Sequence, residues 1–202
     1  MMRLSAADLT CRRGGRTLFS GLSFSLATGE ALVVTGRNGS GKSSLLRLVA
    51  GLLRPESGRI SLEGGDAELG VAEQAHYLGH LDALKPSLTV AENLRFWSAW
   101  LGHAETPPER ALERVGLDEL ADLPAAYLSA GQKRRLSLAR LVAVHRRLWL
   151  LDEPTAALDA DGQIRLADLM RLHLTRGGVI LAAAHGDIGL TNARELKLGG
   201  AP

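Results

Sequence analysis

The octapeptide "GRNGSGKS", residues 36–43, matches the pattern G-x-x-x-x-G-K-[ST] of loops that hold nucleotide phosphates. It follows a short apolar run, "EALVVTG" at residues 30–36, which predicts a buried parallel strand. It opens residues 41–53, where leucines and valine recur at helical spacing. A strand, a glycine-rich loop and a helix in this order predict an α/β protein with a nucleoside triphosphate site.

Each group in this loop has a physical reason to bind phosphate. Glycines let successive backbone N–H groups point at phosphate oxygens without Cβ clashes, and the helix N-terminus adds its positive end. Lys42 is expected to reach the β- and γ-phosphates, and the Ser43 hydroxyl is expected to ligate Mg²⁺. A glycine-rich turn that merely precedes a helix is the alternative, and the flanking strand and helix disfavour it. The predicted nucleotide contacts are Gly36, Arg37, Asn38, Gly39, Ser40, Gly41, Lys42, Ser43 and Ser44.

Composition narrows the class of protein. The chain has 202 residues, 46% hydrophobic and 23% charged, which suits one globular domain with a real core. There are 24 Lys and Arg against 22 Asp and Glu, an excess too small to indicate nucleic acid as a partner. The single cysteine, Cys11, excludes an internal disulfide framework and is expected to be structural. No run is long enough to span a membrane, and residues 1–10 lack an apolar signal-peptide core. We therefore expect a cytoplasmic protein whose membrane role comes through a partner.

The segments before and after the middle of the chain predict strands. Residues 3–11 and 16–27 flank "RRGG", and the second alternates apolar residues with serines, as in a half-buried antiparallel strand. Residues 58–65 predict a further strand or hairpin. Strands are also expected at 147–152 and 178–184, with a helix at 161–175 between them. This alternation indicates an α/β domain.

The middle of the chain, from about residue 86 to 145, has a mostly helical pattern. Thr89 with Glu92 and Thr106 with Glu109 both have the spacing of a capping box, and Pro107 and Pro108 fit a first helical turn. The predicted fold is therefore an α/β P-loop NTPase with an N-terminal antiparallel β subdomain and a helical insertion.

Two acids end the strand "LWLLDEP", residues 148–154. The carboxyl end of a strand beside a phosphate loop is where α/β sheets place ligand-binding groups. Asp152 is expected to hold Mg²⁺, and Glu153 to orient and deprotonate the attacking water. A solvated acidic turn is the alternative, which the phosphate loop disfavours.

The stretch "YLSAGQKRRLSLAR", residues 127–140, resembles the LSGGQ signature of ABC-type ATPases. Ser129 is a good N-cap, and the free N–H groups after it form an anion site. The resemblance implies that Ser129, Ala130, Gly131 and Gln132 contact the γ-phosphate of ATP held by a second copy, with Ala130 in place of the usual first glycine. It further implies that Asp159 in "AALDAD" crosses the dimer interface and that His185 in "LAAAHGD" contacts the γ-phosphate. The resemblance covers residues 1–202 as a single ABC ATPase domain, with a catalytic core at about 1–85 and 141–202 and a helical subdomain at about 86–140.

Two positions depart from that family pattern. Arg13 stands where an aromatic residue usually stacks on adenine, and a guanidinium plane can also stack on a purine. His80 in "YLGH" stands where a glutamine usually touches Mg²⁺ and the attacking water, which makes His80 a third candidate for Mg²⁺ beside Ser43 and Asp152. A neutral imidazole can perform that task through one ring nitrogen. His76, four residues earlier, is expected to be an ordinary residue at a strand edge.

Together "LTCRRGGRTLFSGLSF" at 9–24 and "YLGHLDALKPSLTVAENLRFW" at 77–97 resemble the CcmA-type haem exporter ATPases of cytochrome c maturation. The resemblance implies ATP and Mg²⁺ as cofactors, a homodimer, and an integral-membrane permease subunit as partner. It places the protein peripherally on the cytoplasmic face of the bacterial inner membrane, where ATP hydrolysis would export haem or release a haem-loaded chaperone. No haem site on this chain is predicted, because His103, His145 and His173 have no recognisable ligand arrangement and are expected to be surface or helix residues.

Other classes remain as alternatives. The chain could serve a different ABC transporter, or act as a soluble ABC ATPase of nucleic-acid maintenance or translation. Such soluble ATPases usually carry coiled-coil arms or two cassettes, which this sequence lacks, and it has no basic, aromatic-rich stripe. A small-molecule P-loop kinase is disfavoured by the signature stretch.

Overall fold

The computed structural model describes residues 1–102 and 104–199. An antiparallel sheet, in the order β2-β1-β4, is formed by β1 (Arg3–Arg13), β2 (Arg16–Ala27) and β4 (Ser57–Glu63). Gly14 and Gly15 make the turn between β1 and β2, both with positive φ (56° and 76°), a conformation that glycine adopts at little cost. The N-terminal antiparallel subdomain predicted from the sequence is therefore present.

The second sheet has the order β5-β6-β7-β3-β8, and every neighbouring pair in it is parallel. Its strands are β3 (Ala31–Gly36), β5 (Ala75–Leu78), β6 (Leu148–Asp152), β7 (Val179–Ala183) and β8 (Arg194–Leu198). Every residue of β6 and β7 is buried, because both faces of the sheet are covered.

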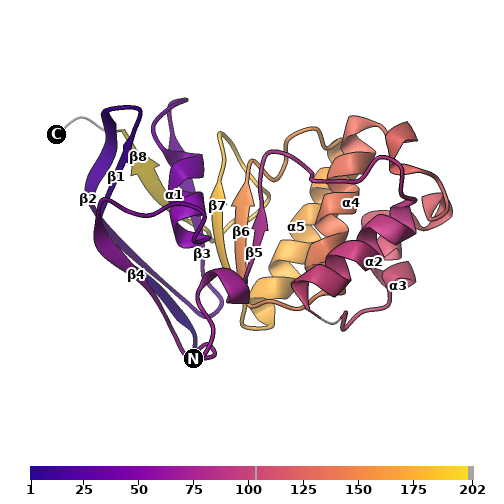
Figure 1. The fold of residues 1–202 in the computed structure, drawn as a ribbon, viewed down its shortest axis with the longest axis horizontal. Coiled ribbons are helices and arrows are strands. Elements are labelled where there is room, and N and C mark those ends of the chain that lie inside the picture. The colour runs from indigo at the N-terminus through magenta and orange to yellow at the C-terminus, as the bar shows by residue number, and fades with distance from the viewer. Residues whose placement is uncertain (103, 200–202) are drawn as a thin grey trace.

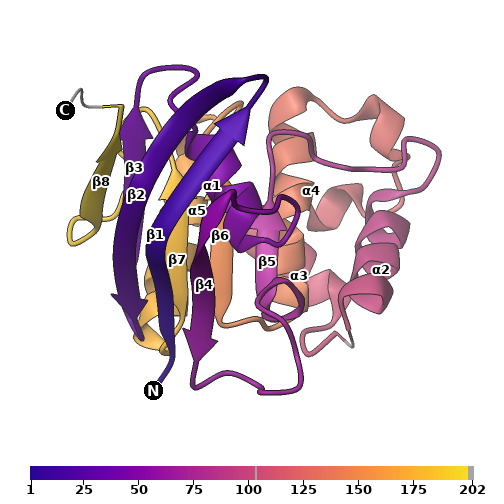
Figure 2. The ribbon, with the colours of Figure 1, turned by 60° about the vertical axis from the view of Figure 1, so that its left-hand side comes forward.

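Two cores lie on the two faces of this parallel sheet. Leu148 and Leu150 of β6 belong to one core, and Trp149 and Leu151, which point the other way, belong to the second. Helix α1 (Lys42–Val49) fills the first core between the two sheets, and α5 (Ala160–Thr175) packs in the second (Figure 1). Figure 2 shows the antiparallel sheet in front of α1 and the parallel strands.

The helical insertion consists of α2 (Val90–Leu101), α3 (Pro108–Val115) and α4 (Ala130–Ala143). Short 3₁₀ turns occur at Asp118–Leu120 and Ala125–Tyr127, and another at Ala72–Gln74 precedes β5. Figure 1 places this group at the opposite end of the molecule from the antiparallel sheet. None of the helices in the part of the chain described here has both the length and the apolar composition needed to cross a membrane.

Of the two predicted capping boxes, the one at the start of α2 is present and the one at the start of α3 is not. Thr89 and Glu92 form both reciprocal hydrogen bonds of the box that starts α2. The Thr106 box is wrong, because the N-cap of α3 is Pro107. A residue before proline is restricted to extended conformations, so Pro107 stays extended (φ −53°, ψ 142°) and the helix begins at Pro108.

Two element boundaries also differ from prediction. The helix expected over residues 41–53 ends at Val49, and Gly51 then adopts the left-handed conformation (φ 70°) that commonly ends helices. Strand β8 was not predicted, because "RELKL" is short and three of its five residues are charged. It forms by pairing along β3, from Leu32 opposite Arg194 to Gly36 opposite Leu198.

Candidate active site

The candidate site lies where β3, β6 and β7 end. Val34 of β3 and Asp152 of β6 both pair with Ala183 of β7. The parallel strands thus bring three segments to one edge of the sheet: the phosphate loop after β3, the acids after β6 and His185 after β7. This is the edge at which open α/β sheets bind ligands.

The end of the phosphate loop is packed closely against strand β2. Gly41, the N-cap of α1, has φ 102°, and a Cβ there would lie 3.0 Å from Cδ1 of Phe19. Lys42 follows at the first position of the helix and is 7% exposed. Its ammonium donates to the carbonyl oxygen of Gly36 (2.9 Å) and lies over the loop that starts there. Lys42 therefore ties the start of helix α1 back to the first residue of the loop.

Ser43 and Asp152 form the candidate magnesium site. The Ser43 hydroxyl donates to Oδ1 of Asp152 (2.9 Å), and Asp152 is 1% exposed. Its second oxygen, Oδ2, is buried and has no hydrogen-bond partner among the described residues. A buried carboxylate oxygen is costly unless it meets a donor or a cation. One carboxylate and one hydroxyl fit Mg²⁺, which usually takes its remaining ligands from phosphates and water.

Glu153, His185 and Lys42 form a second contact set beside this pair. Nε2 of His185 lies 3.0 Å from Nζ of Lys42 and 3.5 Å from Oε1 of Glu153. An ammonium group can only donate, so in this contact Nε2 of His185 is the acceptor. Glu153 has φ 47°, a strained value for a residue with a side chain, and its N–H donates to the carbonyl oxygen of Ala183 (2.9 Å).

The signature residues lie elsewhere in the chain. Ser129 is the N-cap of α4 and forms both bonds of a capping box with Gln132. Ala130 is exposed at the first helical position, where a methyl group meets solvent. Gly131 is tightly placed, because a Cβ there would lie 2.9 Å from the carbonyl oxygen of Ala157. In Figure 1, α4 is separated from α1 along the longest axis and belongs to the group of insertion helices.

Three further predicted residues are exposed. Asp159 caps α5 by accepting the N–H of Gly162 (2.8 Å). His80 follows β5 by two residues, and its neighbour Leu78 pairs with Leu151 of β6, so His80 emerges at the same sheet edge as the acids. Arg13 ends β1 beside the Gly14–Gly15 turn. Among the described residues, none of these three side chains forms a hydrogen bond or ion pair with Lys42, Ser43 or Asp152.

Sequence reasoning missed several residues that the structure makes prominent. His76 is not an ordinary strand-edge residue: it is buried, its Nε2 lies 2.7 Å from the carbonyl oxygen of Val144, and burial lowers its pKa to about 3. His173 lies on a helix as expected but is buried and stacked on Trp149, and burial lowers its pKa to about 4. His145 is exposed and Cys11 is buried, whereas His103 lies outside the described residues. Arg134 is buried beside the acids. Its neighbour in the sequence is also an arginine, and nothing in the sequence indicates which of the two is buried.

Comparison with known proteins decides the family. The model of the family described as "ABC transporter" matches residues 19–156. The chain belongs to the ABC transporter family. This ABC protein shares the fold of a bacterial Atm1-family ABC exporter solved with ATP bound, at a TM-score of 0.82 and 21% identity over 98% of this chain and 37% of that one. The P-loop ABC fold predicted from the sequence is therefore confirmed.

Relatives narrow the family further. A protein of Nitrobacter winogradskyi named cytochrome c biogenesis ATP-binding export protein CcmA is 61% identical, over 99% of this chain and all of that one. A protein of Rhodopseudomonas palustris with the same name is 62% identical over the same shares. This ABC protein is therefore an ATPase of the CcmA family, as its motifs predicted.

Proposed function

We propose that this chain is the ATP-hydrolysing subunit of a membrane complex that serves cytochrome c biogenesis, and that it works as a homodimer enclosing two ATP molecules. The observation that carries the proposal is the cluster of Lys42, Ser43, Asp152, Glu153 and His185 at one sheet edge. The relatives' names speak of cytochrome c biogenesis and export. Hydrolysis would drive haem export or the release of a haem-loaded chaperone. The whole chain acts as one ABC ATPase domain.

Within one copy, each side chain has a distinct task. The loop N–H groups and Lys42 bind the phosphates, and Ser43 and Asp152 hold the ion. Mg²⁺, when bound, neutralises the charge that develops on the transferred phosphoryl group. Glu153 orients the attacking water and accepts its proton through a carboxylate oxygen. His185 contacts the γ-phosphate, which requires Lys42 to turn from the imidazole towards the phosphates.

A second copy completes each site. Because α4 and α1 lie apart in one chain, its signature start can reach a γ-phosphate only across an interface. That copy supplies the backbone N–H of Gly131, the Ser129 hydroxyl, the Gln132 side-chain amide and the positive end of α4, while the backbone N–H groups of Ser129 and Gln132 stay in the capping box. Asp159, exposed at the start of α5, lies on the surface that this interface covers. His80 senses the ion and the water, and Arg13 stacks on adenine.

The surface around residues 79–84 (the His80 segment) suits an integral-membrane partner. Leu81, Trp100 and Tyr127 are exposed to 81%, 75% and 75%. Hydrogen bonds join the segments that carry these three residues. Nε1 of Trp97 donates to the carbonyl oxygen of Ala83 (3.0 Å). The backbone N–H of Ala126 donates to the carbonyl oxygen of Pro86 (3.0 Å). Large exposed apolar side chains on a folded surface mark binding sites for partners. We place the permease subunit here, which puts the chain peripherally on the cytoplasmic face of the inner membrane.

Glu153→Gln tests the catalytic assignment. The amide keeps the shape but accepts no proton, so turnover should fall by about 10²–10⁴-fold while ATP binding is retained. ATP-bound dimers of this variant should accumulate and be measurable by light scattering after size exclusion. Glu119→Gln, on an exposed 3₁₀ turn, is the matched control and should hydrolyse ATP normally. Turnover near that of the wild type in Glu153→Gln would contradict the assignment.

Two further measurements test the assembly. Specific ATPase activity should rise steeply with protein concentration, because each site needs two copies. Equal specific activity from dilute monomer to dimer would rule out the composite site. Affinity purification from membranes should recover a multi-span membrane protein, and Leu81→Asp should reduce that recovery without changing ATP binding. Recovery of only soluble partners would favour an ABC ATPase outside transport.

A further inference from the structure

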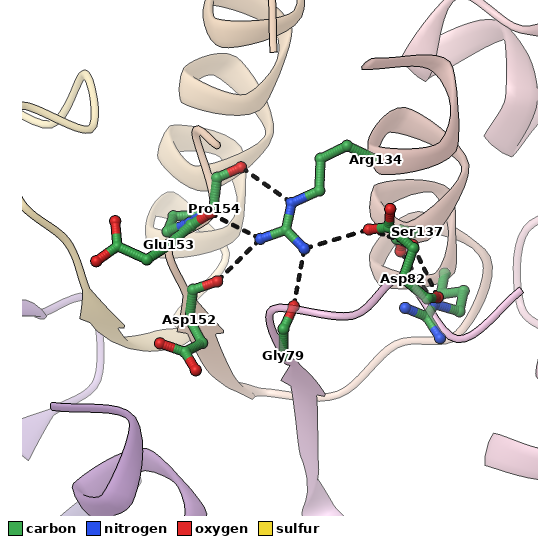
Figure 3. Close-up of polar contacts among 8 residues, drawn as sticks. Gly79, Asp82, Arg134, Ser137, Asp152, Glu153 and Pro154 are labelled. Atoms are coloured by element: carbon green, nitrogen blue, oxygen red, sulfur yellow. Dashed lines mark hydrogen bonds and ion pairs between the residues drawn. The ribbon is translucent and has the colours of Figure 1, made fainter. Parts of the chain in front are cut away.

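One buried arginine joins three parts of the candidate site (Figure 3). Arg134 lies on the second turn of α4, is 3% exposed, and its guanidinium points away from the helix towards the end of β6. A guanidinium has five N–H donors in a fixed plane. Here each donor has an acceptor, so this buried cation is fully hydrogen-bonded.

Three of the acceptors belong to the acids and the turn after β6. Nη2 donates to the carbonyl oxygens of Asp152 (2.9 Å) and Glu153 (2.8 Å), and Nε donates to that of Pro154 (3.4 Å). Glu153 is the strained residue, with φ 47°. A donor fixed on its carbonyl group holds this turn in the conformation that aims the Glu153 carboxylate.

The other two acceptors belong to the segment that carries His80. Nη1 donates to the carbonyl oxygen of Gly79 (2.8 Å) and to Oδ1 of Asp82 (3.3 Å), which supplies the countercharge. Ser137, one turn further along α4, also binds Asp82. Its hydroxyl lies 3.0 Å from the carbonyl oxygen of Asp82 and 3.1 Å from its Oδ1. The His80 segment is thus tied to α4 at two levels.

We propose that Arg134 is a positioning residue for ATP hydrolysis, which couples the signature helix and the His80 segment to the Glu153 turn. A shift of the His80 segment against the membrane partner, or of α4 against a second copy, is passed through one rigid plane to the general base. Its hydrogen bonds within the described residues reach carbonyl groups and Asp82, not the phosphate loop, so it acts on catalysis without holding nucleotide. The inference rests on the proposed role of Glu153.

The adjacent arginine provides a matched control. Arg135 is on the same helix and donates through Nη1 to the carbonyl oxygens of Val115 (3.2 Å) and Gly116 (3.0 Å). Both acceptors lie at the end of α3, inside the helical insertion. Lysine has three donors on a single nitrogen and cannot satisfy acceptors placed around a guanidinium plane. Arg134→Lys and Arg135→Lys therefore remove the same chemistry at two different junctions.

Steady-state ATP hydrolysis by the complex of the chain with its co-purified membrane partner tests the proposal. Arg134→Lys should lower kcat on the order of 10–100-fold, the cost of a small misplacement of a catalytic group. Its KM for ATP should stay within about twofold of the wild type, because the mutated contacts do not touch the phosphate loop. Arg135→Lys should leave both constants within about twofold.

Hydrogen–deuterium exchange of the same proteins separates positioning from loss of folding. In Arg134→Lys the amides of residues 79–84 and 152–158 should exchange faster, while those of 42–49 and 179–183 keep wild-type rates. In Arg135→Lys any increase should be confined to residues 112–118. Two results would overturn the inference in favour of a purely structural role. One is faster exchange throughout the Arg134→Lys protein. The other is a loss of kcat/KM in Arg134→Lys that comes only from a raised KM, with kcat unchanged.

The Glu153→Gln variant keeps the two proposals apart. If it abolishes turnover while Arg134→Lys retains wild-type kcat, the positioning role is refuted and the assignment of the base stands. If Glu153→Gln itself retains turnover, the assignment of the base is refuted, and the positioning role falls with it.

Discussion

The buried histidine of β5 makes the stability of this protein depend on pH. His76 is 3% exposed, and burial is the largest cause that lowers its pKa, to about 3. The hydrogen bond to the carbonyl oxygen of Val144 acts in the opposite direction and does not compensate. The positive charges of Arg146 and Arg140, and His173, lower the pKa further. The folded protein therefore keeps this ring neutral in conditions where an exposed histidine would be charged.

The size of the effect follows from linkage. In the unfolded chain His76 titrates near its ordinary value of 6.5, so below that pH the unfolded state takes up a proton that the folded state refuses. The contribution of the neutral His76 ring to the free energy of unfolding is fully present above pH 6.5 and is lost progressively as the pH falls towards 3. At pH 5 the loss is about 2 kcal/mol, from 1.36 kcal/mol for each of the roughly 1.5 units between 6.5 and 5. His173, with its pKa lowered to about 4, adds a loss of similar size.

Urea unfolding at pH 7.5 and pH 5.0, followed by circular dichroism, measures this loss. His76→Gln keeps a donor near the carbonyl oxygen of Val144 but does not titrate. The difference in unfolding free energy between the two pH values should be about 2 kcal/mol smaller for this variant than for the wild type. Any cost of the substitution itself cancels in that difference. His145→Gln, at an exposed site, is the control and should follow the wild type. An unchanged pH dependence in His76→Gln would refute the reasoning.

Substitutions at four other positions probe the candidate site. His80→Gln should keep most ATPase activity, whereas His80→Ala should lose stimulation by the membrane partner; full stimulation in His80→Ala would leave the residue without a role. Ser129→Asp should keep the cap of α4 and an unchanged melting temperature but prevent ATP-driven dimers in light scattering, whereas Ser129→Ala should cost about 1 kcal/mol of stability. Gly131→Ala should lower turnover at least tenfold, because its Cβ would lie 2.9 Å from the carbonyl oxygen of Ala157. Ala130→Gly should retain turnover. A larger loss in Ala130→Gly than in Gly131→Ala would contradict the packing argument.

The parts of the site that sequence could predict are those encoded in short runs. The phosphate loop and the acids after β6 each follow a strand whose composition is legible by itself. Because parallel strands end at one edge, two such runs predict that Ser43 and Asp152 lie close, and the structure places their oxygens 2.9 Å apart. Ser129 as an N-cap followed from its position before a helical run.

What sequence could not predict depends on contacts between distant segments. Arg134 and Arg135 are adjacent and chemically alike, and only the approach of β6 and the His80 segment to α4 decides which is buried. His76 is buried because α4 ends against β5, which places the carbonyl oxygen of Val144 at 2.7 Å. Strand β8 forms on the edge of β3 although its own pattern is weak.

The start of α4 shows why one serine can serve both the fold and a second copy's nucleotide. In the cap, the Ser129 oxygen accepts the N–H of Gln132 (3.2 Å), and the Gln132 side chain accepts the N–H of Ser129 (2.8 Å). The cap uses the hydroxyl only as an acceptor, so its hydrogen is left to donate to an anion. The N–H groups of Ala130 and Gly131, between the two capping residues, have no acceptor within the helix. The capping box therefore fixes the conformation of residues 129–132 within the single chain, and the closure of the proposed dimer would need a rigid movement of α4 rather than its refolding. Arg134, one turn into that helix, is where such a movement meets the general base.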